Sequence, residues 1–225
     1  MKGPALAFLA AAVFLCLLVV GLLIAVGWTS NHPSAFSYVV RVTGLEGVPA
    51  GPNTDVIVPM PILNGEQGFS DQELQSHLFG DWTSQIVIDG DSKMLAFRTA
   101  DRTLTDINAT FMGTSDQKID LARTGFAPVP SGTGAMRQAV SGDVTKDTTA
   151  RIYLDEEIGG HASGNSTITV TCEVYAGGAI SFGRGEPIHR IRFSEAIPDN
   201  RRGWIEVDPR AEYYNTTEGQ WKPYQ

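Results

Sequence analysis

The chain has 225 residues, a formal net charge of −8 and 42% hydrophobic residues. Downstream of Trp28 the imbalance is larger, because 16 Lys and Arg residues face 25 Asp and Glu residues, which gives 16 − 25 = −9. Such an acidic surface repels nucleic acid and anionic lipid headgroups, so we expect neither as a partner. The roughly 190 residues that remain are ample for one sizeable hydrophobic core.

The N-terminal segment is a candidate transmembrane helix. From Ala5 to Val26 the chain runs for 22 residues without a charged side chain. The apolar core of a signal peptide has about 7–15 residues, whereas about 20 are needed to span a bilayer. The sequence therefore predicts a retained transmembrane helix over residues 5–28, with Trp28 as an aromatic anchor at the membrane interface. The small-x-small pattern Ala25-Val26-Gly27 leaves cleavage as the alternative.

Charge at the two ends of this segment predicts its orientation. Lys2 and the α-amino group precede the segment, and no Lys or Arg follows it until Arg41. The positive-inside rule then places residues 1–4 in the cytoplasm as a short tail. Residues 29–36 become a linker and residues 37–225 an extracytoplasmic domain. No later apolar run approaches 18 residues, so we expect a single-pass protein of the cell membrane, bound to the bilayer through this one segment.

A second hypothesis depends on the same end of the chain. Lys2-Gly3 directly before a long apolar helix resembles the processing site of type IV pilin-like precursors, in which a peptidase cuts after the glycine. The resemblance covers about the first 26 residues and implies a filament subunit whose apolar helix builds the filament core. Pro4 would then be the first mature residue, and no Glu or Gln stands near the start of the apolar run.

The rest of the chain is dominated by short runs in which apolar and polar residues alternate, separated by Gly, Pro, Asp and Asn. This period of two is typical of strands with one buried face. Turn signals at Asp89-Gly90-Asp91-Ser92 and at Gly177-Gly178 predict two hairpins. The pattern predicts a mainly β domain with an antiparallel β-sandwich-like structure. Its expected strands are residues 37–43, 54–61, 83–88, 93–99, 107–114, 151–154, 167–175, 179–182, 189–195 and 203–207.

One short helix is also signalled. In SDQELQSHLFG, Ser70 and Glu73 have the spacing of a capping box, Leu74 and Leu78 share one apolar stripe, and Gly80 can end the helix. A helix of about nine residues does not stand alone, so we expect it to pack on the edge of the sandwich.

Two further features shape the expected domain. Between residues 123 and 150 the alternation vanishes and Gly, Pro, Ser and Thr dominate, which predicts a long loop within one domain, or a boundary between two half-domains. The chain has two cysteines. Cys16 lies within the apolar segment, where it acts as one more apolar side chain. Cys172 is then the only cysteine of the exterior domain, so we expect no disulfide within that domain. In TITVTCEVYAGG, Cys172 alternates with Thr171 and Glu173, which predicts a buried thiol on a strand.

Three asparagines fit the acceptor pattern for N-glycosylation: Asn108, Asn165 and Asn215. Asn165 and Asn215 lie in polar, loop-like surroundings that would accommodate a glycan. Asn108 falls within an expected strand, so its modification requires an exposed face. The pattern agrees with the outward orientation that Lys2 predicts.

Patterns for catalysis or cofactor binding are weak. The chain has four histidines, and no pair has the i, i+4 spacing of a metal site on a helix. Asp155-Glu156-Glu157 and His161 form a cluster that could bind calcium or act as an acid/base pair, although a solvated strand end is the preferred interpretation. We therefore expect no cofactor and no metal, and keep an exported hydrolase as an alternative.

The C-terminal segment WIEVDPRAEYYNTTEGQWKPYQ contains two tryptophans and three tyrosines. Aromatic side chains with polar tips offer a large contact area at low entropic cost. The segment predicts a binding surface made by Trp204, Tyr213, Tyr214, Trp221 and Tyr224. The alternative is that Trp204 belongs to a core strand and the tail packs over the rim of the domain.

Together these features predict a membrane-anchored envelope protein whose exterior β domain serves in binding, adhesion or scaffolding. An envelope protein or a glycan is the expected partner.

Overall fold

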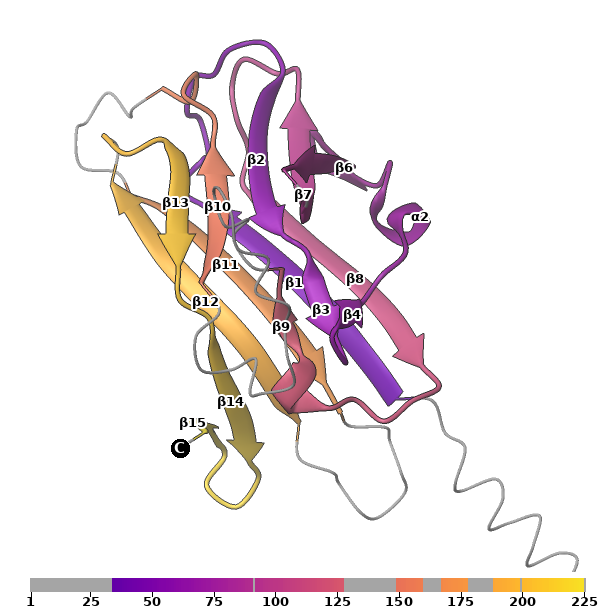
Figure 1. Ribbon diagram of the computed structural model, residues 1–225. Helices are drawn as coiled ribbons and strands as arrows, with labels where there is room; N and C mark the ends of the chain where they lie inside the picture. The colour runs from indigo at the N-terminus through magenta and orange to yellow at the C-terminus, as the bar shows by residue number, and fades with distance from the viewer. Residues whose placement is uncertain are drawn as a thin grey trace, which may run out of the picture. The chain divides into compact units, whose positions relative to one another are not determined.

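The computed structural model describes residues 34–90, 92–127, 149–159, 167–177, 188–198 and 200–224. Strands dominate these ranges (Figure 1). They are β1 (Ser34–Thr43), β2 (Thr54–Pro59), β3 (Pro61–Leu63), β4 (Glu66–Gln67), β5 (Leu78–Phe79), β6 (Trp82–Asp89), β7 (Ser92–Thr99), β8 (Ile107–Ser115), β9 (Gly125–Phe126), β10 (Ala150–Leu154), β11 (Thr167–Ala176), β12 (His189–Pro198), β13 (Gly203–Val207), β14 (Arg210–Asn215) and β15 (Gln220–Pro223). The described helices are the single turn α2 (Asp71–Leu74) and the 3-10 turn η1 (Leu121–Arg123).

The strands form two six-stranded sheets and one small sheet. The first sheet has the order β15-β14-β12-β11-β1-β8, and the second has the order β13-β10-β2-β7-β6-β5. Both are antiparallel throughout. The mainly β fold with antiparallel sheets that the sequence predicts is therefore confirmed.

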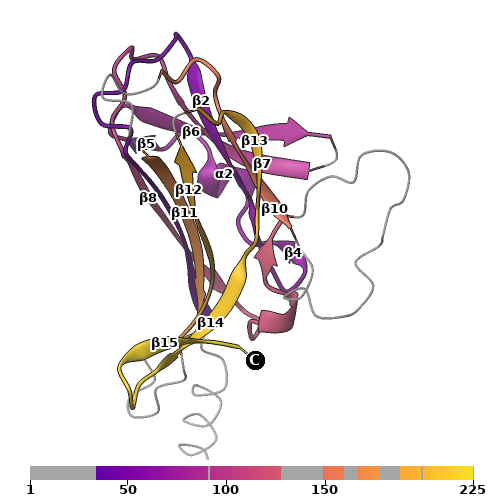
Figure 2. The ribbon, with the colours of Figure 1, turned by 90° about the vertical axis from the view of Figure 1, so that its left-hand side faces the viewer.

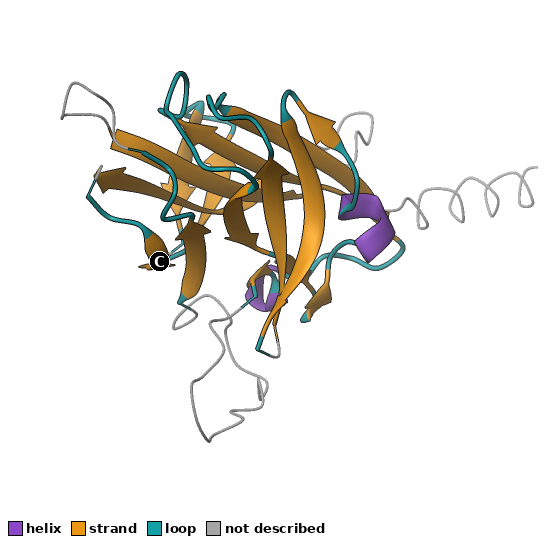
Figure 3. Cartoon of the chain, turned by 90° about the horizontal axis from the view of Figure 1, so that it is seen from above, coloured by secondary structure: helices purple, strands orange, loops and turns teal. Residues whose placement is uncertain are grey.

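The two large sheets lie as two layers with one hydrophobic core between them (Figures 2 and 3). Val40 and Val170 of the first sheet and Val56 and Phe97 of the second are fully buried members of this core. Alternation explains why these residues meet, because every second side chain of each strand points to the inner face. The arrangement fits the expected sandwich.

The strand boundaries differ from the expected ones in several places, and β12, for example, continues to Pro198, three residues beyond its predicted end. β1 begins at Ser34, three residues before the predicted strand. The predicted strand 54–61 is divided at Met60, because β3 leaves the second sheet and pairs with β4 and β9. β9 falls inside the predicted loop 123–150. Most of that loop, residues 128–148, and the predicted strand 179–182 lie outside the described residues.

The predicted nine-residue helix is wrong in length, although its start is right. Glu73 Oε2 accepts a hydrogen bond from the Ser70 backbone N–H at 2.8 Å, which is the glutamate half of a capping box. The Ser70 hydroxyl also donates to this oxygen, at 2.7 Å. α2 ends after Leu74, and Ser76 has a φ of 62°. Leu78 is 75% exposed and opens β5, which pairs with β6. The second half of the segment is therefore a strand that pairs with β6, and not a continuation of the helix.

The two predicted hairpins have different outcomes. Asp89 pairs with Ser92 across a two-residue turn in which Gly90 has a φ of 59°, which confirms the first hairpin. After Gly177 the structure leaves residues 178–187 undescribed. The observed neighbour of β11 on this side is β12, where Ala176 lies opposite His189.

Cys172 is fully buried on the inner face of β11, as the alternation predicts. The Tyr38 hydroxyl donates a hydrogen bond to the Pro59 carbonyl at 2.8 Å and lies 3.7 Å from the Cys172 sulfur. Burial raises the pKa of the Cys172 thiol well above its ordinary value, so the thiol stays protonated and unreactive.

The N-terminal predictions concern residues that the structure does not describe. The expected transmembrane helix from Ala5 to Val26, Cys16 and the pilin-like site at Lys2-Gly3 all lie within residues 1–33, outside the described ranges. From Ser34 onward, no described helix is both long and apolar enough to cross a bilayer.

Candidate binding surface

The last two strands form a hairpin that extends the first sheet at one end (Figure 1). The Asn215 carboxamide oxygen accepts hydrogen bonds from the backbone N–H groups of Thr217 at 3.0 Å and Glu218 at 3.2 Å, and Gly219 completes the turn with a φ of 67°. The sequence did not predict β14 or β15. Tyr213 and Tyr214 are adjacent in the chain, so aromatic side chains occupy both faces of the hairpin and no alternation is visible.

On the outer face of the first sheet, a cluster that we call the aromatic patch comprises Tyr175, Arg190, Tyr214 and Trp221. The guanidinium carbon of Arg190 lies 4.1 Å from the centroid of the Trp221 ring, a cation–π contact. The ring centroids of Tyr175 and Tyr214 lie 6.0 Å and 5.4 Å from that of Trp221. Burial, and next the Glu173 carboxylate, raise the pKa of the Tyr175 hydroxyl, so this group stays neutral.

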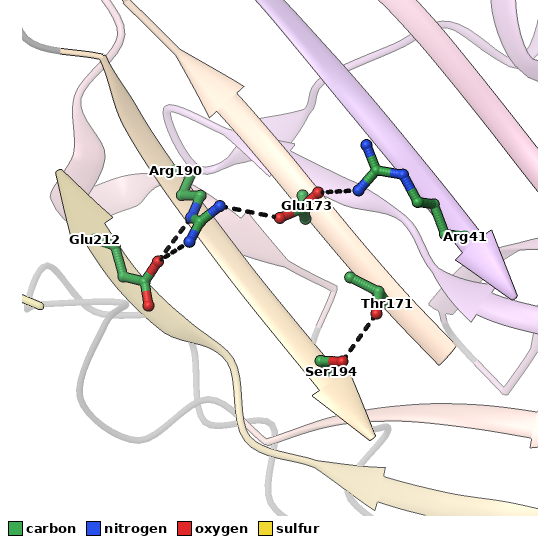
Figure 4. Close-up of polar contacts among 6 residues, drawn as sticks. All are labelled: Arg41, Thr171, Glu173, Arg190, Ser194 and Glu212. Carbon is green, nitrogen blue, oxygen red and sulfur yellow. Dashed lines mark hydrogen bonds and ion pairs between the residues drawn. The ribbon is translucent and has the colours of Figure 1, made fainter. Parts of the chain in front are cut away.

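A chain of ion pairs runs from Arg41 through Glu173 and Arg190 to Glu212 (Figure 4). It holds in place the guanidinium that contacts the Trp221 ring. Arg190 Nη1 lies 3.3 Å from Glu173 Oε1, and its Nε donates to Glu212 at 2.6 Å. The other oxygen of Glu173 accepts from Arg41 at 2.7 Å. The side chains of Glu173 and Arg190 are only 4% and 11% exposed. Because ion pairs shielded from water are strong and geometrically restrictive, the guanidinium has one preferred position.

The opposite face of the hairpin carries a separate aromatic group. The Tyr224 ring stacks on His189 with centroids 5.8 Å apart, and its hydroxyl is hydrogen-bonded to His189 Nδ1. Tyr213 packs against Tyr224 at 5.3 Å. Burial, and next Tyr213, raise the pKa of Tyr224. The hairpin aromatics are therefore divided between two faces.

Trp204 lies apart from the other four predicted residues. It belongs to β13 in the second sheet, opposite Tyr153. Its ring is 5.2 Å from that of Tyr153, the Arg151 guanidinium lies 4.1 Å above it, and the residue is 42% exposed. The structure thus brings Tyr213, Tyr214, Trp221 and Tyr224 onto one hairpin and places Trp204 elsewhere.

Two open hollows lie beside these aromatic groups. One of about 540 Å³ is lined by Ser37, Met112 and Tyr175 among others, next to the aromatic patch. The other, of about 640 Å³, has Ser34 and His189 in its wall. Both give room for a partner to approach the end of the first sheet.

The asparagine candidates occupy different settings. Asn108 is exposed on β8, the edge strand of the first sheet, so the exposed face that its modification requires is present. Asn215 is half-buried and its side chain caps the turn between β14 and β15. Asn165 lies outside the described residues. Glycosylation of all three remains a prediction.

The acidic cluster near β10 has a structural role. The backbone N–H of Asp155 donates to the Asp55 carbonyl at 3.1 Å, and the Asp155 carboxylate accepts from the backbone N–H groups of Asp55 at 3.3 Å and Glu157 at 2.9 Å. These bonds join the end of β10 to β2. Glu156 and Glu157 are exposed, and His161 lies outside the described ranges. Over the part of the chain that the structure describes, no three His, Cys, Asp or Glu side chains gather as a metal site would require.

Sequence reasoning missed three residues of the surface: Tyr175, His189 and Arg190. Each lies on a predicted strand, and nothing in the sequence alone links the three to the C-terminal aromatics. The sequence feature that could have found Arg190 is Glu173, which lies on the polar face of its strand. Opposite charges on neighbouring strands stabilise a sheet, so a carboxylate there favours a basic residue on the adjacent strand. Pairing β11 with β12 would then have placed Arg190 beside Tyr175.

Comparison of the chain with models of protein families, with curated proteins and with solved structures yields no match.

Proposed function

We propose that the chain is a single-pass, membrane-anchored envelope protein whose exterior β domain binds a partner through the aromatic patch. The apolar segment from Ala5 to Val26 supports the anchor, and Lys2 on its N-terminal side supports an outward-facing domain. The partner is another component of the envelope, a protein or a glycan.

One observation carries the binding role: Trp221 is stacked on a guanidinium that is itself fixed by buried charge. Arg190 contacts the Trp221 ring at 4.1 Å and is paired with Glu173 and Glu212. Tryptophan, tyrosine and arginine dominate the energetics of binding surfaces because they give a large contact area without much loss of conformational freedom. A patch already ordered in the free protein reduces the entropic cost of association further.

Binding is favoured over hydrolysis because Asp155, one of the carboxylates that could have formed an acid/base pair, is engaged in hydrogen bonds to the backbone. Asp155 accepts two backbone hydrogen bonds that join β10 to β2 and the following turn. A general acid or base must instead be free to contact a reacting group.

The proposal predicts that Trp221→Ala abolishes capture of the partner. Membranes that contain the full chain are treated with a cross-linker, the chain is isolated, and cross-linked protein and glycan are quantified. We expect recovery to fall about tenfold or more, as at other interface hot spots. Trp204→Ala is the matched control, because Trp204 is also stacked on an arginine, at 4.1 Å, but lies in the other sheet. Equal recovery with both variants would contradict the proposal, provided that both melt at the wild-type temperature.

A further inference from the structure

Exposed apolar side chains gather at the end of the first sheet where the described chain begins. Phe36 lies opposite Ala176, Ala176 opposite His189, and His189 opposite Tyr213. This row crosses four neighbouring strands, two residues after the start of β1 at Ser34. The tether end, as we call it, is the part of the sheet formed by Ser34, Ile188, His189, Tyr213 and Tyr224.

Two members of the tether end present apolar surface to solvent. Tyr224 is 44% exposed and Ile188 is 40% exposed. The backbone N–H of Tyr214 donates to the Ile188 carbonyl at 2.8 Å, which fixes Ile188 beside the hairpin. A hollow of about 640 Å³ opens beside them and has Ile119, Leu121 and Ala176 in its wall. The wall also contains Lys118, Asp120 and His189, so apolar and polar side chains are mixed at this end.

The tether end is also close to the proposed bilayer by chain length alone. Only residues 27–33 separate Val26 from Ser34, and seven residues span at most about 25 Å when fully extended. The far end of β12, at Pro198, lies nine residue steps from His189, about 30 Å along the strand. Ser34 therefore stays within about 25 Å of the membrane surface, so the sheet end that contains it is able to reach the lipid.

Charge does not oppose such an approach. The domain is acidic, but β14, β15 and the turn between them contain two basic residues, Arg210 and Lys222, and two acidic residues, Glu212 and Glu218. Glu218 forms an ion pair with Lys222, and Glu212 pairs with Arg190. The hairpin is thus a neutral region on a surface that would otherwise be repelled by anionic headgroups.

We propose that the tether end rests in the interfacial zone of the protein's own membrane, with Tyr224 and Ile188 at the level of the lipid headgroups. This inference depends on the membrane anchor of the proposed function. Tyrosine is favoured at this depth because its ring is apolar and its hydroxyl is polar, and the Tyr224 hydroxyl has a hydrogen-bond partner in His189 Nδ1. A short tether keeps the local concentration of the hairpin high, so a few side chains suffice.

The test places a fluorescent probe at the tether end of the full chain. In a Trp28→Phe, Trp221→Phe background, the remaining tryptophans are Trp82, which is buried, and Trp204, which follows the far end of β12. Adding Tyr224→Trp gives the test variant. Both proteins are inserted into phosphatidylcholine nanodiscs with and without bromine on the upper acyl chain, which quenches tryptophan on contact.

We expect the test variant to lose about a third of its emission in brominated discs while the background protein loses almost none. Adding Ile188→Ser should reduce the loss, whereas Ile88→Ser, at an exposed isoleucine of the second sheet, should not. No extra quenching at position 224, as when a second copy covers this end, would overturn the inference, and so would equal quenching of the background. Release of the chain from membranes by alkaline carbonate would instead show that the proposed anchor has failed.

Discussion

Replacing Trp82 by Ala is expected to lower the free energy of unfolding by about 3–5 kcal/mol. Trp82 is the largest fully buried side chain and packs in the core between the two sheets. Its indole N–H donates to the Thr105 carbonyl at 2.9 Å. The substitution removes this bond and leaves a cavity that the surrounding strands cannot fill. Urea unfolding of the full chain in detergent micelles, followed by tyrosine fluorescence or circular dichroism, measures the loss.

Two further variants separate packing from hydrogen bonding. Trp82→Phe retains most of the volume but leaves the Thr105 carbonyl without its donor, so we expect a cost of about 1–3 kcal/mol. Trp204→Ala removes a side chain that is 42% exposed and should cost about 1 kcal/mol or less. If Trp82→Ala were no more harmful than Trp204→Ala, the two sheets would not share the core that we describe.

Replacing Glu173 by Gln is expected to cost about 2–3 kcal/mol, because it removes the charge between two arginines in a site with little water. Glu173 accepts from Arg41 at 2.7 Å and from Arg190 at 3.3 Å. The matched control is Glu195→Gln on the neighbouring strand. Glu195 is 37% exposed and lies 3.9 Å from Arg201, so its ion pair should contribute under about 1 kcal/mol.

Double-mutant cycles then distinguish the two partners of Glu173. The coupling energy with Arg190, whose side chain is 11% exposed, should exceed that with Arg41, which is 48% exposed. Water and salt screen the exposed pair more strongly, although its distance is shorter. Equal losses for Glu173→Gln and Glu195→Gln, in urea unfolding of the full chain, would show that the ion-pair chain does not stabilise the sheet.

Alternation predicted the strands whose two faces differ in polarity. β11 is an example, since Ile168, Val170 and Cys172 are buried and Thr167 is exposed. The same logic failed for β14, where Tyr213 and Tyr214 place aromatic rings on both faces. It also failed for β5, because a two-residue strand is too short for any periodicity and its residues continued a helical pattern from α2.

The composition of the C-terminal segment indicated an aromatic surface. It did not indicate which residues of other strands contact these aromatic rings, or that the rings lie on different faces and sheets. Arg190 could not be placed beside Trp221, nor Glu173 beside Arg190, without the register of three strand pairs. Trp204 joined the prediction because it is near the other aromatics in the chain. In the structure its strand, β13, pairs with β10 in the opposite sheet, because the chain changes sheets between Pro198 and Gly203. The pilin-like hypothesis stays a prediction, because its residues precede Ser34.

The central claim, an apolar segment retained in the membrane with the β domain outside, is tested most directly by labelling Thr83→Cys in intact cells with a membrane-impermeant maleimide. Thr83 is exposed on β6. The wild-type chain provides the background, because the Cys172 thiol is fully buried with a raised pKa and Cys16 lies within the proposed transmembrane segment. We predict that the variant is labelled before lysis, that the wild type is not, and that the labelled chain sediments with membranes. Labelling only after the cells are opened would contradict the account.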